Sequence, residues 1–486
     1  MKQEKLCEYK DYLTGWKCHY KALDDSEDGF CIFHDTRKDK DITTFNNGIK
    51  RILENENSET YDFHGYVFPV IVDFSGFKFK KDVYFIDSKF VGNITLFREA
   101  EFTGKNTSFE RAKFSGEIAD FHKTKFLGEN ISFSMAEFSS RYTDFEKTEF
   151  ASRNIEFGQS KFAGENTLFL DTIFSGERMD FSWAEFLGKE TNFITVKFSS
   201  SNSNFIFTKF SGEHTFFSWV EFIGERTNFT GTEFIGKEVN FYHSNFLKKI
   251  VFTKATFKAR TSFTGVDLGK CIFANVDLKN VDFSLLEWDW KDKLSNETKL
   301  KETLKELRVK KRECYFITSE IYQQLKVQFH NKRDFAKAGM FHFREQECKR
   351  KACKLPKDFF RWIFLWILKL SCGYGEKLRN VGLSSLALVL IFGIIYMFLG
   401  LHSSDLNESL IFQYVITLRN TVPIGTIIKD YLSSLSFSVK GFFPLWRFQQ
   451  YKVVGDFANL VAGFEFLLGA FLIGLFIYVF RRRMEK

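Results

Sequence analysis

The sequence predicts a mainly β fold, a long solenoid of stacked coils, followed by a helical hairpin and two membrane-spanning helices. Three observations lead to this prediction. Phenylalanine recurs at fixed intervals over residues 61–290, which indicates a repeat architecture. Helical spacing of apolar residues replaces that period after residue 290. Two apolar stretches long enough to cross a bilayer follow near the C-terminus.

The phenylalanine period defines the coil. One series runs from Phe97 to Phe241 with a step of 12 residues, and a second runs from Phe102 to Phe246 with the same step. The spacing between successive phenylalanines therefore alternates between five and seven. Neither an α-helix nor simple strand alternation has that spacing. It fits a coil that turns a corner every few residues and points one large side chain inward from each face.

Small residues accompany the phenylalanines. The position two residues before each member of the second series holds a small side chain, for example Ala100, Ala112 and Thr124. We interpret this position as a second inward site with little room. Glycine often stands two residues after the second series, as at Gly104 and Gly116. We expect these glycines to supply unusual backbone angles at the corners.

The end of this stretch contains the runs Gly-Val-Asp-Leu at 265–268, Ala-Asn-Val-Asp-Leu at 274–278 and Asn-Val-Asp-Phe at 280–283. These runs resemble the pentapeptide-repeat family, whose pattern is a small residue, Asp or Asn, Leu or Phe, and two free positions. The resemblance implies a right-handed quadrilateral β-helix with about 20 residues per coil. The 40 inward positions would then make ten coils. We interpret the seven-residue step as two extra residues at alternate corners.

The outward positions of the repeats carry charges of both signs in nearly equal number. We therefore expect no nucleic acid partner, and no imitation of DNA such as some proteins of this family show. We expect a scaffold or regulatory binding domain, with a protein partner on a face that Trp183 and Trp219 mark; the alternative is that both tryptophans simply cover corners. The chain has no phosphate-binding glycine loop, nucleophile elbow or paired carboxylates, so we expect no enzyme.

Residues 1–60 form a segment of different composition. Cys7, Cys18, Cys31 and His34 follow the spacing C-x10-C-x12-C-x2-H, and three thiolates with one imidazole suit a structural zinc site. The alternative is a set of reduced, buried cysteines, since eight cysteines in 486 residues without a secretory signal suggest a reducing compartment. Residues 43–55 are predicted to form a helix that covers the first coil.

Residues 291–356 change to helical spacing and carry part of the basic excess of a chain whose net charge is +8. A turn at 331–334 divides two predicted helices, which resemble the hairpin after the repeats in membrane-bound pentapeptide-repeat proteins. Residues 357–375 hold an apolar helix too short to span a membrane, which needs about 20 residues. Its two tryptophans and neighbouring basic residues favour a helix in the membrane interface. The alternative is a buried helix of a soluble domain.

Residues 376–486 contain two predicted spans, Val381 to Leu401 and Phe457 to Phe480. Basic residues precede the first span and follow the second, so the positive-inside rule predicts a multi-pass cell-membrane protein with both termini and the β-helix in the cytoplasm. Glu465 lies inside the second span, and a charge at that depth indicates function. The alternative places Glu465 near the outer boundary, paired with Lys440 or Lys452.

The arrangement of span, intervening segment and span resembles the two-helix pore module of potassium-type channels. Gly375 before the first span and the run Glu-Phe-Leu-Leu-Gly at 465–469 carry this likeness. At the position of the filter loop stand Ser438, Val439, Lys440, Gly441 and Phe442. One glycine and a lysine replace the glycine-rich filter, so we expect no potassium selectivity; the alternative is that Lys440 turns away to pair with Asp430 or Glu465.

The combined prediction is a membrane-anchored pentapeptide-repeat protein with a degenerate ion-channel-like pore module, assembled as a homo-oligomer. The alternative prediction is a non-conducting, membrane-anchored scaffold for protein interactions. A pore requires a water path along the helix that carries Glu465, whereas a scaffold does not.

Overall fold

The computed structural model describes residues 5–37, 40–403, 424–443, 451–453 and 455–484. The chain forms two compact units, Met1–Ile321 and Tyr322–Lys486. The boundary falls inside α4 (Lys311–Asn331), the first helix of the predicted hairpin.

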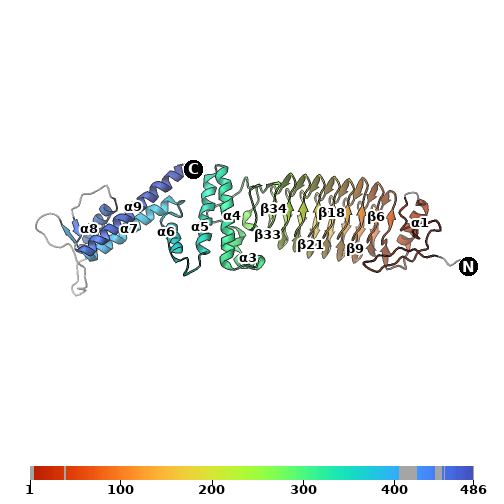
Figure 1. Cartoon of the computed structure of the whole chain (residues 1–486), viewed down its shortest axis with the longest axis horizontal. Helices are drawn as coiled ribbons and strands as arrows, with labels where there is room; N and C mark the ends of the chain where they lie inside the picture. Colours follow the sequence, from red (N-terminus) through yellow and green to blue (C-terminus); the bar gives the residue numbers. More distant parts are fainter. Residues whose placement is uncertain (1–4, 38–39, 404–423, 444–450, 454, 485–486) are drawn as a thin grey trace. The chain divides into compact units, whose positions relative to one another are not determined.

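The first unit is a β-solenoid of about nine turns, built from four parallel sheets (Figure 1). The first sheet runs from β1 (Thr60–Asp62) to β36 (Cys271–Ala274), and the second from β2 (Val67–Phe68) to β34 (Thr256–Phe257). The third runs from β3 (Val72–Asp73) to β37 (Val281–Asp282), and the fourth from β4 (Lys78–Phe79) to β32 (Asn245–Phe246). These sheets hold ten, nine, ten and eight strands, which confirms the predicted fold class.

The register of the strands confirms the interpretation of the seven-residue step. In the middle of the rod Phe114 pairs with Phe138, so one coil takes 24 residues. Near the end Thr261 pairs with Val281, so one coil takes 20. The four extra residues of a middle coil lie in its two seven-residue steps, two in each.

Stacked phenylalanine rings fill the interior. Most inward rings stack on the ring one coil later, as for Phe138 and Phe162, whose centroids are 4.8 Å apart with planes 1° from parallel. Rings in neighbouring columns meet edge to face, as for Phe133 and Phe145 at 5.8 Å and 87°. Such pairs contribute about 0.5–1.5 kcal/mol each beyond burial of their area. The solenoid core is therefore a continuous aromatic column that depends on contacts between adjacent coils.

In the middle of the rod each five-residue step turns through a β-turn of type II. The Ala100 N–H donates to Phe97 O at 3.0 Å, and Glu99 between them has a φ of 57°. The predicted role of the corner glycines needs correction: Gly116 has a positive φ, but Gly164 does not. A Cβ on Gly164 would lie 1.8 Å from Ser140 O, so close stacking of backbones excludes a side chain there.

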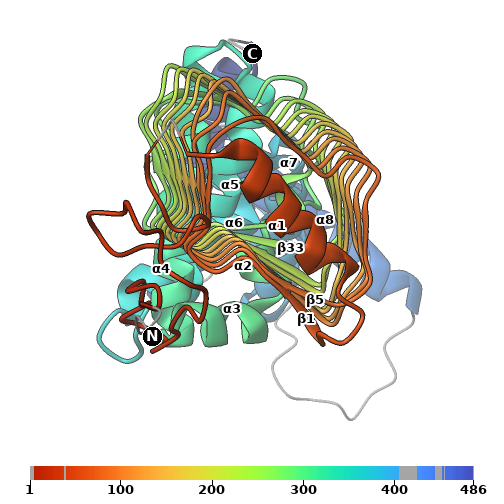
Figure 2. The same cartoon turned by 90° about the vertical axis from the view of Figure 1, so that its right-hand side faces the viewer.

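Helices cover both ends of the solenoid. The helix α1 (Ile42–Glu54) lies across the first coil and buries Phe45 and Ile49 against it, as predicted (Figure 2). At the other end follow the short helix η1 (Leu268–Lys270), then α2 (Ser295–Thr298) and α3 (Leu300–Leu307). The Asn296 side chain binds both backbone groups of Phe273 in β36, with distances of 3.2 Å from Phe273 N and 2.9 Å to Phe273 O.

The second unit is mainly helical in its described residues. The hairpin partner α5 (Phe335–Lys351) is followed by α6 (Phe359–Cys372), α7 (Leu378–Leu399), α8 (Ile424–Phe442) and α9 (Asp456–Met484). Strands β38 (Leu401–Ser403) and β39 (Tyr451–Val453) pair antiparallel. Both α7 and α9 are long and apolar enough to cross a membrane, and only 22% and 17% of their apolar windows are buried. The helix α8 packs against both of them.

Candidate metal centre and intramembrane carboxylate

The structure brings Cys7, Cys18, Cys31 and His34 together at the N-terminal end of the solenoid. All four side chains are buried, and their ligand atoms lie within 4.8 Å of one another. Cys18 Sγ is 3.7 Å from Cys31 Sγ, and His34 Nδ1 is 3.6 Å from Cys7 Sγ and 3.1 Å from Cys31 Sγ. The four predicted residues therefore form one cluster that can bind a metal ion.

Two local structures place these ligands. Isolated bridges pair Leu6 with Lys21 and Lys10 with Lys17, so the chain folds back on itself and brings Cys7 beside Cys18. The second half is the turn that starts at Cys31, whose carbonyl accepts from the His34 N–H at 3.0 Å. The sequence identified this second half by its spacing. The first half depends on a fold-back that the spacing of ten residues does not specify.

The geometry fits a tetrahedral ion. Sulfur ligands about 2.3 Å from zinc lie about 3.8 Å apart in a tetrahedron, close to the distance between Cys18 and Cys31. The other ring nitrogen of His34, Nε2, is 2.8 Å from His64 O, which leaves Nδ1 toward the sulfur atoms. The Cys31 N–H lies 3.2 Å from Cys7 Sγ, and hydrogen bonds from Cys18 and Cys31 hold the pKa of Cys7 far below its usual range. These contacts favour the thiolate of Cys7, the form that metals bind, whereas hydrogen bonds with Cys31 and Cys7 together with burial raise the pKa of Cys18.

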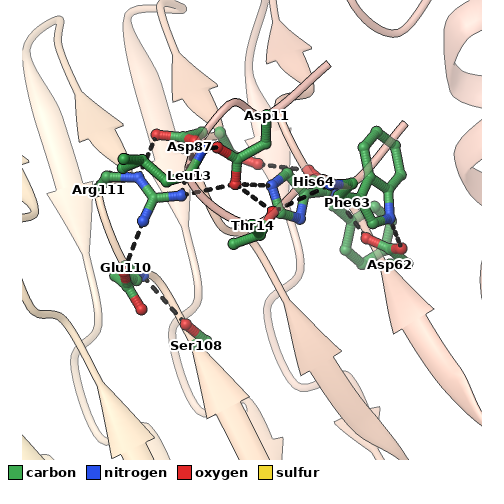
Figure 3. A network of polar contacts seen from close by, with 12 residues as sticks. Asp11, Leu13, Thr14, Asp62, Phe63, His64, Asp87, Ser108, Glu110 and Arg111 are labelled. Carbon is green, nitrogen blue, oxygen red and sulfur yellow. Dashed lines mark hydrogen bonds and ion pairs between the residues drawn. The ribbon is translucent and has the colours of Figure 1, made fainter. Parts of the chain in front are cut away.

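A polar network connects the N-terminal segment to the outside of the solenoid (Figure 3), and His64 links this network to the cluster. The backbone carbonyl of His64 accepts a hydrogen bond from the His34 ring. The ring nitrogen Nε2 of His64 lies 3.0 Å from a carboxylate oxygen of Asp11. Arg111 Nη2 donates to the same oxygen of Asp11 at 2.9 Å, and Arg111 also donates to both oxygens of Asp87 at 2.9 Å. Asp11 and Arg111 are 100 residues apart in the sequence. Sequence reasoning missed this network because no spacing connects its members.

Asp11 is ionised within this network. Although burial opposes its charge, hydrogen bonds from Thr14, Leu13 and His64 together with Arg111 lower the pKa of Asp11 to about 2. Two further acidic groups with histidine occur on the solenoid. Arg111 already occupies the first, at Asp11, His64 and Asp87. The second, at His122, Asp144 and Glu146, is partly exposed, and Glu146 pairs there with Lys147 at 2.6 Å.

Two exposed aromatic ladders lie at corners of the solenoid. Trp183, 58% exposed, stacks on Phe207 with centroids 4.5 Å apart. Trp219, 54% exposed, stacks on His243 at 4.8 Å. Both tryptophans occupy the positive-φ position of a type II turn, which points them outward. They therefore cover corners while leaving large apolar surface open to solvent.

In the second unit the carboxylate of Glu465 is completely buried. Tyr396 of α7 donates to Glu465 Oε2 at 2.5 Å, and Ser438 of α8 makes a short hydrogen bond to Oε1. These two hydroxyls, rather than Lys440, are the partners of Glu465 among the described residues. The side chain of Lys452, the other partner considered from the sequence, lies outside the described residues.

The five residues expected in a filter loop lie in the last two turns of α8, so their backbone is helical, not an open loop. Ser438 contacts Glu465, and a Cβ on Gly441 would lie 3.1 Å from Glu465 Oε2. Phe442 is buried, whereas Val439 is exposed. The carbonyl of Phe442 lies so close to α9 that a Cβ on Gly469 would meet it at 2.6 Å. The end of α8 therefore fits tightly against α9.

The predicted interfacial helix, α6, has two different sides. One side exposes the apolar stripe of Phe360, Ile363, Phe364, Ile367 and Leu370. On the other side Lys369 binds Glu347 of α5 at 2.9 Å, and Glu347 also accepts from Arg350 and Tyr374. Burial raises the pKa of Glu347, but these hydrogen bonds outweigh it and lower the pKa to about 2. The exposed stripe does not fit the alternative of a buried helix.

Comparisons with protein-family models, curated proteins and solved structures found no match to this chain. The β-solenoid is established by its four stacked parallel sheets. The likeness to pentapeptide-repeat proteins and to potassium-type pore modules stays a prediction from the motifs.

Proposed function

We propose that the chain is a membrane-anchored pentapeptide-repeat protein whose second unit is a degenerate ion-channel-like module. The observation that carries this proposal is the seating of α8 between the two apolar helices, through the contacts of Glu465 with Tyr396 and Ser438. A third helix held between two spans is the arrangement of a pore module. The weakly buried surfaces of α7 and α9 support contact with lipid.

The basic residues set the proposed orientation. Lys377 and Arg379 precede the apolar span that starts at Val381, and Arg481 follows the span that ends at Phe480, so both ends of the module face the cytoplasm together with the solenoid. The apolar stripe of α6, next to the basic run 349–351, supports a position in the interface of the same leaflet. In this arrangement Glu347 connects the interfacial helix to the hairpin.

The N-terminal cluster binds zinc in a structural role, because four protein ligands fill a tetrahedral site. Cys7, Cys18, Cys31 and His34 would hold the ion, which would cross-link a cap of irregular structure. No catalytic function is proposed for it, since no ligand position remains for a substrate.

The proposed pore is a homo-oligomer and does not select potassium. Selective filters present rings of backbone carbonyls from an extended loop, and here the corresponding residues are the helical end of α8. In a symmetric assembly Lys440 would add one positive charge per subunit, which disfavours cations.

Reversal potentials test this proposal. The full-length protein is reconstituted in planar bilayers of defined lipid, and currents are recorded under a potassium gradient. We expect either a current without preference for potassium over sodium, or none; Lys440→Ala should remove any preference for anions. A potassium preference like that of selective filters contradicts the proposal, and Lys429→Ala on the exposed side of α8 is the control.

The alternative function is a non-conducting anchored scaffold that binds a protein through the solenoid. The exposed ladders of Trp183 with Phe207 and of Trp219 with His243 favour it, because exposed aromatic clusters dominate protein interfaces. This function is supported if the natural protein carries no current and if Trp183→Ser or Trp219→Ser no longer binds a cytoplasmic protein that the natural protein binds. Binding that persists in both variants argues against it.

A further inference from the structure

The hydrogen bonds around Glu465 need one more proton than the neighbouring hydroxyls supply. Ser438 Oγ lies within hydrogen-bond distance of Glu465 Oε1 and also of Val389 O, at 3.0 Å from the latter. A hydroxyl has one proton to donate. Tyr396 gives its single proton to Glu465 Oε2. Two hydroxyl protons therefore face three acceptor oxygens.

A proton on Glu465 completes the arrangement. The carboxylic acid then donates from Oε1 to Ser438 Oγ, Ser438 donates to Val389 O, and Tyr396 donates to Oε2. Every hydrogen bond in this series then has one donor and one acceptor, and the series connects α9 to α8 and α7. An ionised carboxylate would instead leave a buried negative charge without a cation, which is costly inside a membrane.

The surrounding charges do not supply that cation. Among the described residues, no lysine, arginine or histidine forms an ion pair with Glu465. On α7 the ionisable group that faces Glu465 is Tyr396 itself. On α8 the ionisable residues are Lys429, Asp430, Tyr431 and Lys440, and the Tyr431 hydroxyl points to Leu390 O at 3.4 Å. On β38 and β39 they are His402, Lys452 and Tyr451, whose side chains lie outside the described residues.

We propose that Glu465 is a membrane-embedded proton-binding site whose protonated form holds α8 between α7 and α9. The ligand is H⁺, and no metal or organic ion is required. When the proton is lost, the Ser438 hydroxyl can donate to Glu465 or to Val389 O, but not to both. The ionised carboxylate also introduces a negative charge between three helices. The seating of α8 is therefore linked to proton binding. This inference rests on the proposed membrane insertion and adds a ligand to that module.

Infrared spectroscopy of the full-length protein in phospholipid nanodiscs tests the protonation. Near neutral pH almost all other carboxyl groups are ionised, so a carboxylic-acid C=O band identifies the site. We expect the band in the natural protein, its loss in Glu465→Gln, and its retention in Asp430→Asn, which changes a buried carboxylate on the neighbouring helix α8. A band that Glu465→Gln leaves unchanged, or no band at all, overturns the proposal.

Hydrogen exchange of α8 tests the linkage. Glutamine has one carbonyl acceptor for Tyr396 and one N–H donor for Ser438, so it imitates the neutral acid. We expect the backbone amides of α8 to keep their exchange protection in Glu465→Gln. In Glu465→Ala and in Ser438→Ala the same amides should exchange about tenfold faster, because a buried hydrogen bond is lost. Equal loss of protection in the glutamine and alanine variants overturns the proposal.

Membrane insertion is measured separately on cell membranes by resistance to alkaline extraction. A protein that alkaline buffer extracts contradicts the proposed function and the proton site together. A protein that stays inserted but shows no Glu465-dependent C=O band contradicts the proton site alone.

Discussion

The two ends of the solenoid are closed by different means. At the C-terminal end one amide, that of Asn296, binds both backbone groups of Phe273 and so replaces the next coil. At the N-terminal end Phe33 O accepts from Val67 N at 2.8 Å, and the buried Lys40 Nζ donates to Val67 O at 2.5 Å. Both ends thus satisfy edge groups that would otherwise pair with another chain.

The difference lies in what orders each cap. Asn296 sits in a helical segment whose backbone bonds are regular. Residues 5–37 contain two isolated bridges and turns but no helix or longer strand. A segment without regular structure loses much conformational entropy on folding. The N-terminal cap therefore needs a cross-link, which the zinc ion proposed at the cysteine cluster would provide, whereas the C-terminal cap does not.

The largest expected effect is that of Cys31→Ser. Removal of one of four ligands should abolish metal binding and release the whole cap, because binding free energy at such sites is folding free energy. We expect about one zinc per chain in the natural protein and none in the variant, measured by elemental analysis, with rapid proteolysis before residue 60.

The matched control is Cys353→Ser, which lies outside the cluster and is only partly buried. Natural protein that contains no metal, when purified without chelator, would contradict the zinc proposal. The C-terminal cap should keep its protection in both variants.

The next effect is expected from Asn296→Ala at the other end. The N–H and C=O of Phe273 would lose their partner, and unsatisfied buried groups cost about 1–3 kcal/mol each. We expect a decrease of about 2–4 kcal/mol in the local free energy of opening, measured by hydrogen exchange in β36. Metal content should not change. Equal protection in Asn296→Ala and in the exposed control Asn202→Ala would show that the amide is not the cap.

A smaller effect is expected from Arg111→Gln. The variant removes the cation between Asp11 and Asp87 but leaves the contact of Asp11 with His64. Loss of a partly buried ion pair should lower the free energy of cap opening by about 1–3 kcal/mol. Hydrogen exchange of residues 5–37 measures it. The exposed control Arg153→Gln also breaks an ion pair between coils, with Glu177, and should change little; a similar loss in both variants would contradict the role of the network.

The smallest expected effect is the loss of cap stability at low pH. A carboxylate with a lowered pKa stabilises the fold above its unfolded pKa and loses that contribution as the pH falls through its folded pKa. For Asp11 the loss is complete only near its pKa of about 2. Hydrogen bonds from Arg226, together with Lys249, lower the pKa of Glu306 in the C-terminal cap despite burial, so its contribution is lost below the usual glutamate range.

Protons displace zinc from thiolates, so we expect the N-terminal cap to open on acidification before Asp11 is protonated. Proteolysis across a pH series with an acid-tolerant protease measures the opening of each end. An N-terminal cap that stays closed until the pH approaches 2 would show that the network of Asp11, His64 and Arg111 holds it without metal.

The sequence by itself determined the features that repeat or that lie close together. The step of 12 residues in the phenylalanine series predicted the stacked coils, because each coil contacts only its neighbours and every contact recurs. The helix 43–55 and the turn at 331–334 were likewise confirmed at nearly the predicted positions, and long apolar helices occupy both predicted spans. The residues of the metal cluster were identified by residue type and spacing.

Only the tertiary structure decided the contacts that occur once. Arg111 meets Asp11 because the cap lies along the outside of particular coils, and Asn296 meets Phe273 because the chain folds back over the last turn. Glu465 meets Tyr396 and Ser438 across 69 and 27 residues of sequence. The physical reason is the same in each case: such a contact depends on where a loop returns, and the local spacing of residues does not encode that position.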